Sequence, residues 1–473
     1  MKTVCLIFSL VMSAISFCQS LQTRLTNAIK GLEDNQQFKH AIISLYVVDT
    51  KTGKVIFDKN SQVGLAPASC QKVVTSVSAF EILGKDFHYT TYIGKDPTGN
   101  DKFNAGSLLI IGKGDPTLGS WRWKNTVDTI IFAKIAAALR KNDLTSFERN
   151  LYVDDIFYGL QPLPGGWVWE DIGNYYGAAC FGFNWHENQY DLVLQPGERE
   201  GYPTTIVKTV PALTRFNFSN SITTGNKGSG DNGYIYSAPF TNFAIASGTI
   251  PLQQKTFTIT GSMPDPAKIF KEQLVNYLQA HKITISDTSY SYSSNLLTNQ
   301  SVYKATHFID SIASPSLDSI NYWFLKKSVN LFGEAFLKSI AIQKYPFVDR
   351  VNIYDSAITI IKNFWKEKGI DKSALNIIDG SGLSPANRVT THSLVTVMQY
   401  ATLQNWFTSF YYALPEMNGI KMKDGYISGV RSYTGYIKSK AGAEYTFSFI
   451  VNNFDGSAGT AREKMWQVLD ILK

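Results

Sequence analysis

Hydrophobic and polar positions near the start of the chain follow two different periods. Residues 21–29 carry apolar side chains at the spacing of one helical face, which predicts an amphipathic helix. The apolar run 40–49 predicts a strand, and after the turn-forming residues 50–54 the short run 55–57 is its predicted hairpin partner. A strand, a hairpin and then a helix that begins near Ser69 indicate an α+β arrangement.

From about residue 89 the pattern changes to short apolar runs separated by glycine-rich turns. The elements predicted for this block are strands over 88–93, 107–111 and 256–260 and helices over 128–141 and 264–281. The sequence of the block contains no internal repeat. We therefore interpret residues 91–299 as an insertion of one or more domains, mostly β, with an architecture of their own.

Beyond residue 308 helical patterns dominate, and strands return at the end of the chain. The predicted elements are helices over 315–327, 331–343, 354–368 and 390–403, strands over 426–431, 433–438 and 445–452, and a final helix over 460–472. A terminal helix packed on a sheet that also contains the N-terminal strands would close one discontinuous domain. We expect this domain to consist of residues 21–90 and 300–473.

The first residues have the features of a secretory leader. A basic start precedes an apolar run over 4–12 that is too short to span a membrane. We predict a signal peptide over residues 1–18. A lipid anchor on Cys18 is the alternative, which the bulky Phe17 before it disfavours. Because no later stretch resembles a transmembrane helix, we expect an exported, periplasmic protein with no membrane span in the mature chain.

Composition narrows the classes of function. A chain of 473 residues with 44% hydrophobic and 18% charged residues is expected to form roughly two or three domains. The net charge of +7 suits contact with an acidic polymer such as cell wall, but the basic residues form no run, which argues against nucleic acid. The six histidines lack metal-ligand spacing, so neither a metal nor a cofactor is expected. Cys70 and Cys180 are expected to be buried thiols, with a bridge between them as the alternative.

The main candidate for chemistry is the stretch from Pro67 to Lys72, which places a serine at the mouth of an apolar helix. Residues three apart lie on one helix face, so Lys72 can reach the hydroxyl of Ser69. The helix N-terminus favours an incipient alkoxide, and a lysine kept neutral by burial can accept the proton. The plain alternative is a serine that only caps the helix. A second Ser-x-x-Lys, from Ser301 to Lys304, lies in polar, strand-like sequence with no apolar helix behind it.

A serine and an asparagine two apart occur in the predicted turn between two helices. Ser328 and Asn330 can both point into one cleft from this turn, although ordinary capping residues would have the same pattern.

A lysine on a strand at the edge of the cleft would complete the set. Lys423, followed by Asp424 and Gly425, opens the predicted C-terminal strands. The literal Lys-Thr-Gly at 51–53 precedes Ser69 and is explained as the turn of the first hairpin.

Ser-x-x-Lys, Ser-x-Asn and Lys-x-Gly in this order resemble the motifs of the penicillin-binding proteins and serine β-lactamases. The chain most resembles the D-alanyl-D-alanine carboxypeptidase/endopeptidase family of class C low-molecular-mass penicillin-binding proteins, peptidase family S13. Further stretches that carry the resemblance are 114–118, 166–167, 176–178, 187–188, 314–317, Glu334, 379–384 and 429–436. They cover nearly the whole mature chain, and a large insertion after the nucleophile helix is itself typical of that family.

The resemblance implies both a fold and an activity. The fold would be a transpeptidase-like α+β domain, an antiparallel sheet with helices, interrupted by the mostly β insertion. The activity would be that of a serine D,D-carboxypeptidase/endopeptidase, which cleaves peptidoglycan stem peptides and is acylated by β-lactam antibiotics.

The resemblance also implies roles for single residues. The implied catalytic groups are Ser69 as nucleophile, Lys72 as base, Ser328 as proton relay to the leaving amine, Asn330 as partner of the substrate amide or of Lys72, and Lys423 as the positive charge near the substrate carboxylate. The backbone N–H groups of Ser69 and Tyr426 would form the oxyanion hole, and Gly425 would line the substrate site. An acidic residue of the insertion is expected to meet the free amine of the stem peptide, with Asp154 or Asp155 as candidates.

Asp424 departs from the family pattern, which has Thr or Ser at this position. An ionised aspartate would repel the carboxylate of the terminal D-residue, and Lys423 would offset part of the repulsion. Val329 is a milder departure, in place of a common Asp. Two alternatives therefore stay open: a catalytically weakened peptidoglycan- or penicillin-binding protein, and a β-lactamase or esterase of the same fold, against which the large insertion argues.

Overall fold

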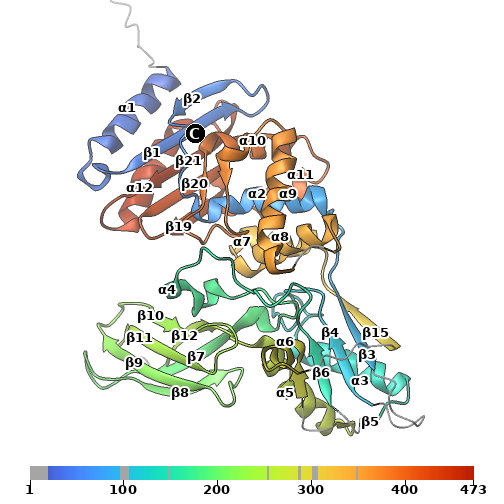
Figure 1. The fold of residues 1–473 in the computed structure, drawn as a ribbon. Coiled ribbons are helices and arrows are strands. Elements are labelled where there is room, and N and C mark those ends of the chain that lie inside the picture. The colour runs from blue at the N-terminus through green and yellow to red at the C-terminus, as the bar shows by residue number, and fades with distance from the viewer. Residues whose placement is uncertain are drawn as a thin grey trace, which may run out of the picture.

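The computed structural model describes residues 20–95, 106–147, 150–252, 255–285, 289–300, 307–347 and 350–473. The expected signal peptide and the second Ser-x-x-Lys, at 301–304, lie outside the described residues. The described chain forms two halves, one above the other in Figure 1, and the candidate catalytic motifs belong to the upper half.

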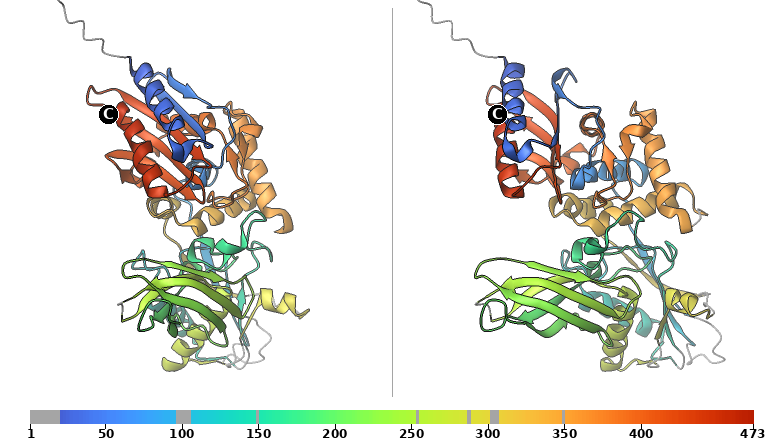
Figure 2. Two further views of the ribbon diagram at one scale, coloured as in Figure 1. Left: turned by 90° about the vertical axis from the view of Figure 1, so that its left-hand side faces the viewer. Right: turned by 60° about the vertical axis from the view of Figure 1, so that its left-hand side comes forward.

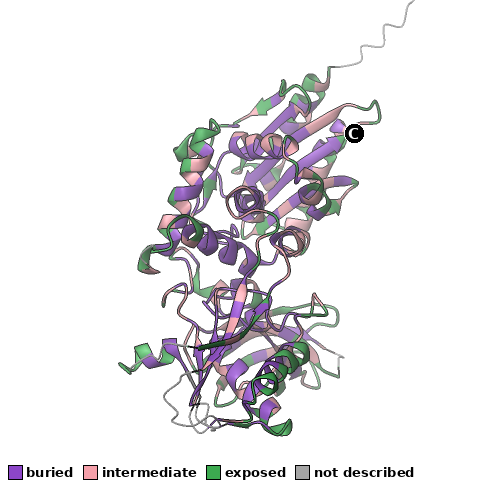
Figure 3. Ribbon diagram, turned by 90° about the vertical axis from the view of Figure 1, so that its right-hand side faces the viewer, coloured by how far each residue is buried: buried purple, intermediate pink, exposed green. Residues whose placement is uncertain are grey.

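The upper half contains a six-stranded antiparallel sheet in the order β18-β19-β20-β21-β1-β2. Its strands are β1 (Ile42–Asp49), β2 (Val55–Lys59), β18 (Glu416–Met417), β19 (Ile420–Ile427), β20 (Val430–Lys438) and β21 (Glu444–Asn452). Because β1 pairs with β21, the sheet joins the two ends of the chain, as the apolar patterns predict. The central strands of the sheet are mostly buried, and Figure 3 shows them largely purple.

Helices cover both faces of this sheet. One apolar core includes side chains from α1 (Leu21–Glu33), the sheet and α12 (Ala458–Leu469). The core on the other side includes α2 (Lys72–Ile82), α7 (Leu317–Lys326), α8 (Asn330–Lys344), α9 (Ile353–Glu367), α10 (Thr391–Thr402) and α11 (Phe407–Ala413). A short hairpin of β16 (Leu375–Asn376) and β17 (Arg388–Val389) lies between α9 and α10 in the sequence. The predicted helices of this half are confirmed, and α11 is an additional one.

The lower half is the inserted block, and its described residues form four sheets. A five-stranded mixed sheet has the order β14-β6-β4-β3-β15, two three-stranded sheets have the orders β12-β7-β8 and β10-β11-β9, and β13 pairs with β5. Its strands are β3 (Thr90–Lys95), β4 (Leu108–Ile111), β5 (Ser146–Phe147), β6 (Leu151–Asp154), β7 (Gln189–Gln195), β8 (Thr205–Val210), β9 (Asn217–Gly225), β10 (Asn232–Tyr236), β11 (Phe243–Pro251), β12 (Phe257–Ser262), β13 (Thr284–Ile285), β14 (Ser289–Ser291) and β15 (His307–Ala313). Its helices are α3 (Asp128–Lys141), α4 (Trp169–Ile172), α5 (Pro266–Ala280) and α6 (Tyr292–Leu297).

The pairing of β15 with β3 bears on the predicted domain boundaries. Residues 307–313 follow the expected boundary at residue 300, yet they form a strand of the inserted sheet. We keep the two-part division as a proposal and place the end of the insertion after β15.

The expected strand over 426–431 is wrong. β19 ends at Ile427, and Gly429 adopts a φ of +68° in the turn before β20 begins at Val430. Apolar and aromatic residues continue on both sides of this two-residue turn, and their pattern conceals the reversal. Lys423 therefore lies within β19 rather than at the opening of a strand.

Candidate active site

Ser69 lies in the 3-10 turn Ala68–Gln71 that leads directly into α2. Helix α2 is held in the core by Val73, Val74 and Val77, all of which are buried. The apolar run after Ser69 therefore fixes the serine at the N-terminal end of a rigid helix, as predicted. The competing Lys-Thr-Gly, residues 51–53, is exposed in the β1–β2 turn.

Lys72 is fully buried and its Nζ reaches three oxygen atoms. Nζ lies 2.9 Å from Ser69 Oγ, 2.6 Å from Asn330 Oδ1 and 2.7 Å from the carbonyl oxygen of Ser381. The last two oxygens only accept hydrogen bonds, so they use the two N–H groups of a neutral amine and leave its lone pair for the Ser69 hydroxyl. Burial, followed by the charge of Lys423, lowers the pKa of Lys72 to about 7.

Asn330 and Ser328 occupy the turn between α7 and α8. Asn330 Nδ2 donates to the carbonyl oxygen of Tyr176 at 2.7 Å, while its Oδ1 holds Lys72. Ser328 is half-buried and has a φ of +57°. Within the described residues the Ser328 hydroxyl forms no hydrogen bond, so it is available to a substrate. Of the two roles expected for Asn330, the geometry supports the one of holding Lys72.

Lys423 and Asp424 form an ion pair at the other side of the cleft. Lys423 is 1% exposed, and its Nζ donates to Asp424 Oδ1 at 3.0 Å and to the carbonyl oxygen of Asp424 at 2.7 Å. Burial alone would raise the pKa of Asp424, but Lys423 and Arg431 outweigh it and hold this pKa below its usual value. Asp424 is therefore ionised and takes up part of the charge that Lys423 would present to a ligand.

Strand β19 approaches the nucleophile through its glycine. A Cβ on Gly425 would lie 2.8 Å from the Ser69 nitrogen and 2.7 Å from the carbonyl oxygen of Pro67. In the part of the chain that the structure describes, the Ser69 N–H has no acceptor. The backbone N–H of Tyr426 follows directly in β19, so the arrangement is compatible with the expected pair of oxyanion donors.

Asp379 is a site residue to which the sequence reasoning gave no role. Its carboxylate accepts hydrogen bonds from three side chains and from two backbone N–H groups of its own loop. The donors are Trp167 Nε1, Gln71 Nε2, Asn387 Nδ2, Gly382 N and Ser384 N, at 2.6–3.2 Å. These bonds fix the loop whose Ser381 carbonyl holds Lys72. The sequence feature that could have identified Asp379 is the run Asp-Gly-Ser-Gly-Leu-Ser at 379–384. In the sequence it supports the family resemblance but indicates no role for a single residue.

Glu334 is a second buried carboxyl group behind the site. Both of its oxygens lie 3.1 Å from the backbone N of Gly380. Burial, together with Asp379, raises the pKa of Glu334 to about 8, which favours the protonated form at neutral pH. A neutral Glu334 adds little attraction for a protonated Lys72, and this keeps the amine a base.

The structure does not bring Asp154 and Asp155 to this cleft. Asp154 is the last residue of β6 in the lower half (Figure 1), and Asp155 comes directly after it. Asp155 accepts hydrogen bonds from the Ser293 hydroxyl and backbone N–H within the insertion. Acidic residues nearer to the cleft are Glu170 and Asp171 on α4. Asp171 interacts with Tyr176, whose carbonyl holds Asn330, and burial raises the pKa of Asp171 to about 6.

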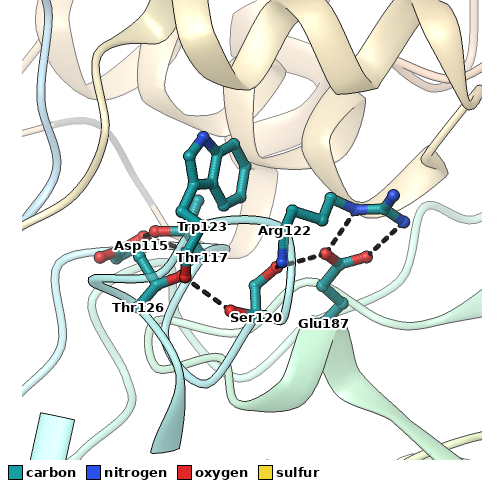
Figure 4. Close-up of polar contacts among 7 residues, drawn as sticks. All are labelled: Asp115, Thr117, Ser120, Arg122, Trp123, Thr126 and Glu187. Carbon is teal, nitrogen blue, oxygen red and sulfur yellow. Dashed lines mark hydrogen bonds and ion pairs between the residues drawn. The ribbon is translucent and has the colours of Figure 1, made fainter. Parts of the chain in front are cut away.

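A largely buried ion pair within the insertion stabilises a loop that contacts the catalytic half (Figure 4). Glu187 Oε1 accepts from Arg122 Nε at 2.7 Å and from Ser120 Oγ at 2.6 Å, and Glu187 Oε2 accepts from Arg122 Nη2 at 3.0 Å. In the same loop Trp123 Nε1 donates to Ser319 Oγ of α7 at 2.8 Å. The loop therefore packs against the helix that precedes the Ser328 turn.

The two cysteines are buried free thiols, as expected. Burial raises the pKa of Cys70 to about 11 and that of Cys180 to about 12, so neither thiol is a nucleophile at neutral pH. Over the described residues, no helix has the length and apolar character needed to cross a membrane.

Comparisons with known proteins show which family and fold this chain resembles. Residues 25–471 match the D-Ala-D-Ala carboxypeptidase 3 (S13) family. The chain is 24% identical to a D-alanyl-D-alanine carboxypeptidase of Actinomadura sp. (strain R39), over 93% of this chain and 83% of the relative. It is 20% identical to the D-alanyl-D-alanine carboxypeptidase DacB of Haemophilus influenzae, over 85% and 83%. The crystal structure of penicillin binding protein 4 (dacB) from Haemophilus influenzae, in complex with a β-lactam, has the same fold, with a TM-score of 0.73 at 17% identity over 94% of this chain and 97% of that chain.

Proposed function

The chain belongs to the D-Ala-D-Ala carboxypeptidase 3 (S13) family, whose members are serine peptidases, and on this premise we propose that Ser69 is the nucleophile of its D,D-peptidase reaction. The observation that carries the proposal is the set of contacts around Lys72. Two obligate acceptors lie within hydrogen-bond distance of Nζ, and Ser69 Oγ lies 2.9 Å from it. Burial lowers the pKa of Lys72 to about 7, and the neutral amine then has a lone pair for the Ser69 proton.

Acylation begins when Ser69 Oγ attacks the carbonyl carbon of the penultimate D-Ala and gives its proton to Lys72 Nζ. The carbonyl oxygen becomes an oxyanion, which the N–H groups of Ser69 and Tyr426 stabilise. The C–N bond then breaks, and the leaving amine takes, through the Ser328 hydroxyl, the proton that Lys72 Nζ had accepted, so that Lys72 is neutral again. The product of this step is an ester on Ser69, with the terminal residue released as a free amine.

Deacylation reverses these roles with water as the nucleophile. Water attacks the ester carbonyl and gives a proton to Lys72 Nζ, and the ester bond breaks to return Ser69 Oγ as a hydroxyl. In both steps the Asn330 and Ser381 oxygens keep Nζ in place, because they hold its two N–H groups. A β-lactam would follow the acylation step and remain on Ser69 where its ester resists water.

The substrate class follows from the family and the cleft. Peptidoglycan stem peptides that end in D-Ala, or are cross-linked through it, would lie between β19 and α4. Glu170 and Asp171 replace Asp154 and Asp155 as the acidic groups proposed to meet a free amine of the stem. A cell-wall substrate requires an exported protein, which agrees with the leader-like start of the sequence.

The ion pair of Lys423 with Asp424 supports a second candidate function. Because Asp424 is ionised and bound to Lys423, the site offers less positive charge to a terminal carboxylate than a hydroxyl residue at this position would allow. The second candidate is a penicillin- and peptidoglycan-binding protein whose peptide turnover is slow.

Labelling with fluorescent penicillin tests the proposal. Wild type is expected to be labelled and to release D-Ala from a pentapeptide, whereas Ser69→Ala is expected to do neither. Absence of labelling in wild type would overturn the proposed nucleophile. Labelling without D-Ala release would favour the binding protein, and rapid penicillin hydrolysis would favour a β-lactamase.

A further inference from the structure

Among the described residues, one face of the inserted sheet β10-β11-β9 is covered at the β10 edge by α4 and otherwise open, and it has an unusual composition. Eight of its outward-facing positions are Asn217, Ser219, Ser221, Tyr234, Tyr236, Phe243, Ile245 and Ser247. Phe243 is 49%, Ile245 42% and Tyr234 38% exposed. None of the eight residues is charged, although charged residues make up 18% of the whole chain.

The strand register places these side chains in rows. Tyr236 pairs with Ile245, which pairs with Ser219, and Tyr234 pairs with Ser247. Cross-strand neighbours on one face lie about 5 Å apart, so the aromatic and aliphatic groups are interleaved with hydroxyl groups. The other face of the sheet is a packed core, because Ala244, Ala246 and their neighbours are buried in the apolar cluster of the insertion.

This face continues into the active-site cleft through α4. The ring of Trp169, which is 50% exposed, lies 6.1 Å from the ring of Tyr236 at an angle of 33°. Burial, and after it Glu170, raises the pKa of Tyr234, and Tyr426 of β19 is among the nearby groups that contribute. Figure 1 shows α4 between β19 above and β10 below, and both views of Figure 2 show the green strands of the insertion below the catalytic half.

The chemistry of the face selects an uncharged, hydroxyl-rich polymer. The C–H face of a pyranose ring packs on Tyr, Trp or Phe, while ring hydroxyls and acetamido groups exchange hydrogen bonds with Ser and Asn. None of the eight side chains offers a charge to an acidic or basic partner. Exposed aromatic patches next to a cleft mark interaction sites. We propose that this face binds the glycan strand of peptidoglycan while an attached stem peptide enters the cleft at Ser69, an inference that rests on the proposed function.

Binding to glycan strands stripped of their stem peptides by an amidase tests this proposal. The full-length chain with Phe243→Ser and Ile245→Thr combined is compared with wild type by co-sedimentation. Both substituted side chains lie on the exposed face of β11, so the buried face of the sheet is unchanged. Serine is polar and threonine is β-branched, and both are compatible with an exposed strand. We expect binding to fall by at least about tenfold. Turnover of a short soluble D-Ala-D-Ala peptide, which cannot reach this face, is expected to stay within about twofold.

Two controls separate the proposal from its rivals. Tyr412→Ser removes an aromatic side chain that is 66% exposed on α11, and it is expected to bind glycan as wild type does. Ser69→Ala is also expected to bind fully, so a failure of the proposed catalysis leaves the binding result interpretable. Equal glycan binding by the double variant and wild type would overturn the proposal. A change from dimer to monomer in the double variant without loss of glycan binding would also overturn it and would identify a self-association surface.

Discussion

The reactivity of Ser69 depends on single atoms around Lys72. Asn330 Oδ1 and the Ser381 carbonyl oxygen are both acceptors without a proton of their own, so either could satisfy an ammonium or a neutral amine. Burial decides between the two forms, because it disfavours the charged one and lowers the pKa of Lys72 to about 7. The loop at 379–384 and the turn at 328–330 each contribute one of these acceptors, so both segments are needed to hold Lys72 Nζ.

The substitution Asp424→Thr tests how far the negative charge of Asp424 limits peptidase activity. The variant releases Lys423 from the ion pair and adds a hydroxyl that can bind a terminal carboxylate. We expect kcat/KM for a peptide ending in a free carboxylate to rise about tenfold, which corresponds to about 1.4 kcal/mol. Steady-state release of D-Ala measures it. Asp424→Asn, which removes only the charge, is expected to gain less, and an unchanged or lower rate in the Thr variant would refute the repulsion argument.

At the scale of elements, the site depends on the close approach of strand β19 to the turn that contains Ser69. Strand β19 can run next to the turn at Ser69 only because residue 425 has no side chain. This contact sets the position of the Tyr426 N–H relative to the Ser69 N–H, and thus the shape of the oxyanion hole.

Gly425→Ala is expected to slow acylation by at least about tenfold, since a methyl group would push β19 away from the Ser69 nitrogen. Stopped-flow acylation by a penicillin measures the rate. Gly165→Ala is the matched control, because a Cβ there would have no atom within 4 Å. Wild-type acylation by Gly425→Ala would show that the backbone of β19 takes no part in the oxyanion hole.

Sequence patterns predicted the long apolar elements well. Helices α3, α7, α8, α9 and α10 and strand β1 follow from periodic apolar runs, because burial of one face requires that pattern. The short exposed strands of the insertion, such as β8 and β10, have too few buried positions to show a period. The same limit applies to the site: Ser69 and Lys72 are neighbours on one helix, whereas the role of Asp379 arises from contacts between residues more than 200 positions apart.

In the whole molecule, the insertion and the catalytic half are in contact at the active site around Lys72. Trp167 donates to Asp379, and the carbonyl of Tyr176 accepts from Asn330, so two residues of the insertion hold the groups that hold Lys72. A third contact is the loop stabilised by Glu187 and Arg122, which reaches α7. Removal of the insertion would therefore disturb the catalytic geometry as well as any binding surface.

Glu187→Ala tests the stability of this junction. Glu187 is fully buried and pairs with Arg122, whose side chain is 14% exposed. Loss of Glu187 leaves a largely buried guanidinium without its carboxylate and is expected to cost about 3 kcal/mol of unfolding free energy. Urea unfolding measures the loss. Lys30→Ala breaks the exposed pair with Asp34 and is expected to cost less than about 1 kcal/mol. Similar costs for the two variants would show that the buried pair does not stabilise the junction.

The most direct test of the central claim is the pH dependence of acylation in wild type. If neutral Lys72 accepts the proton of Ser69, the rate must be lost as the pH falls below the pKa of this amine in the folded protein. We expect the acylation rate constant, measured by stopped flow with a penicillin, to rise with pH through an apparent pKa of about 7 and then to level off. A rate that rises only toward the ordinary lysine value of 10.5, or that does not change across this range, would contradict it.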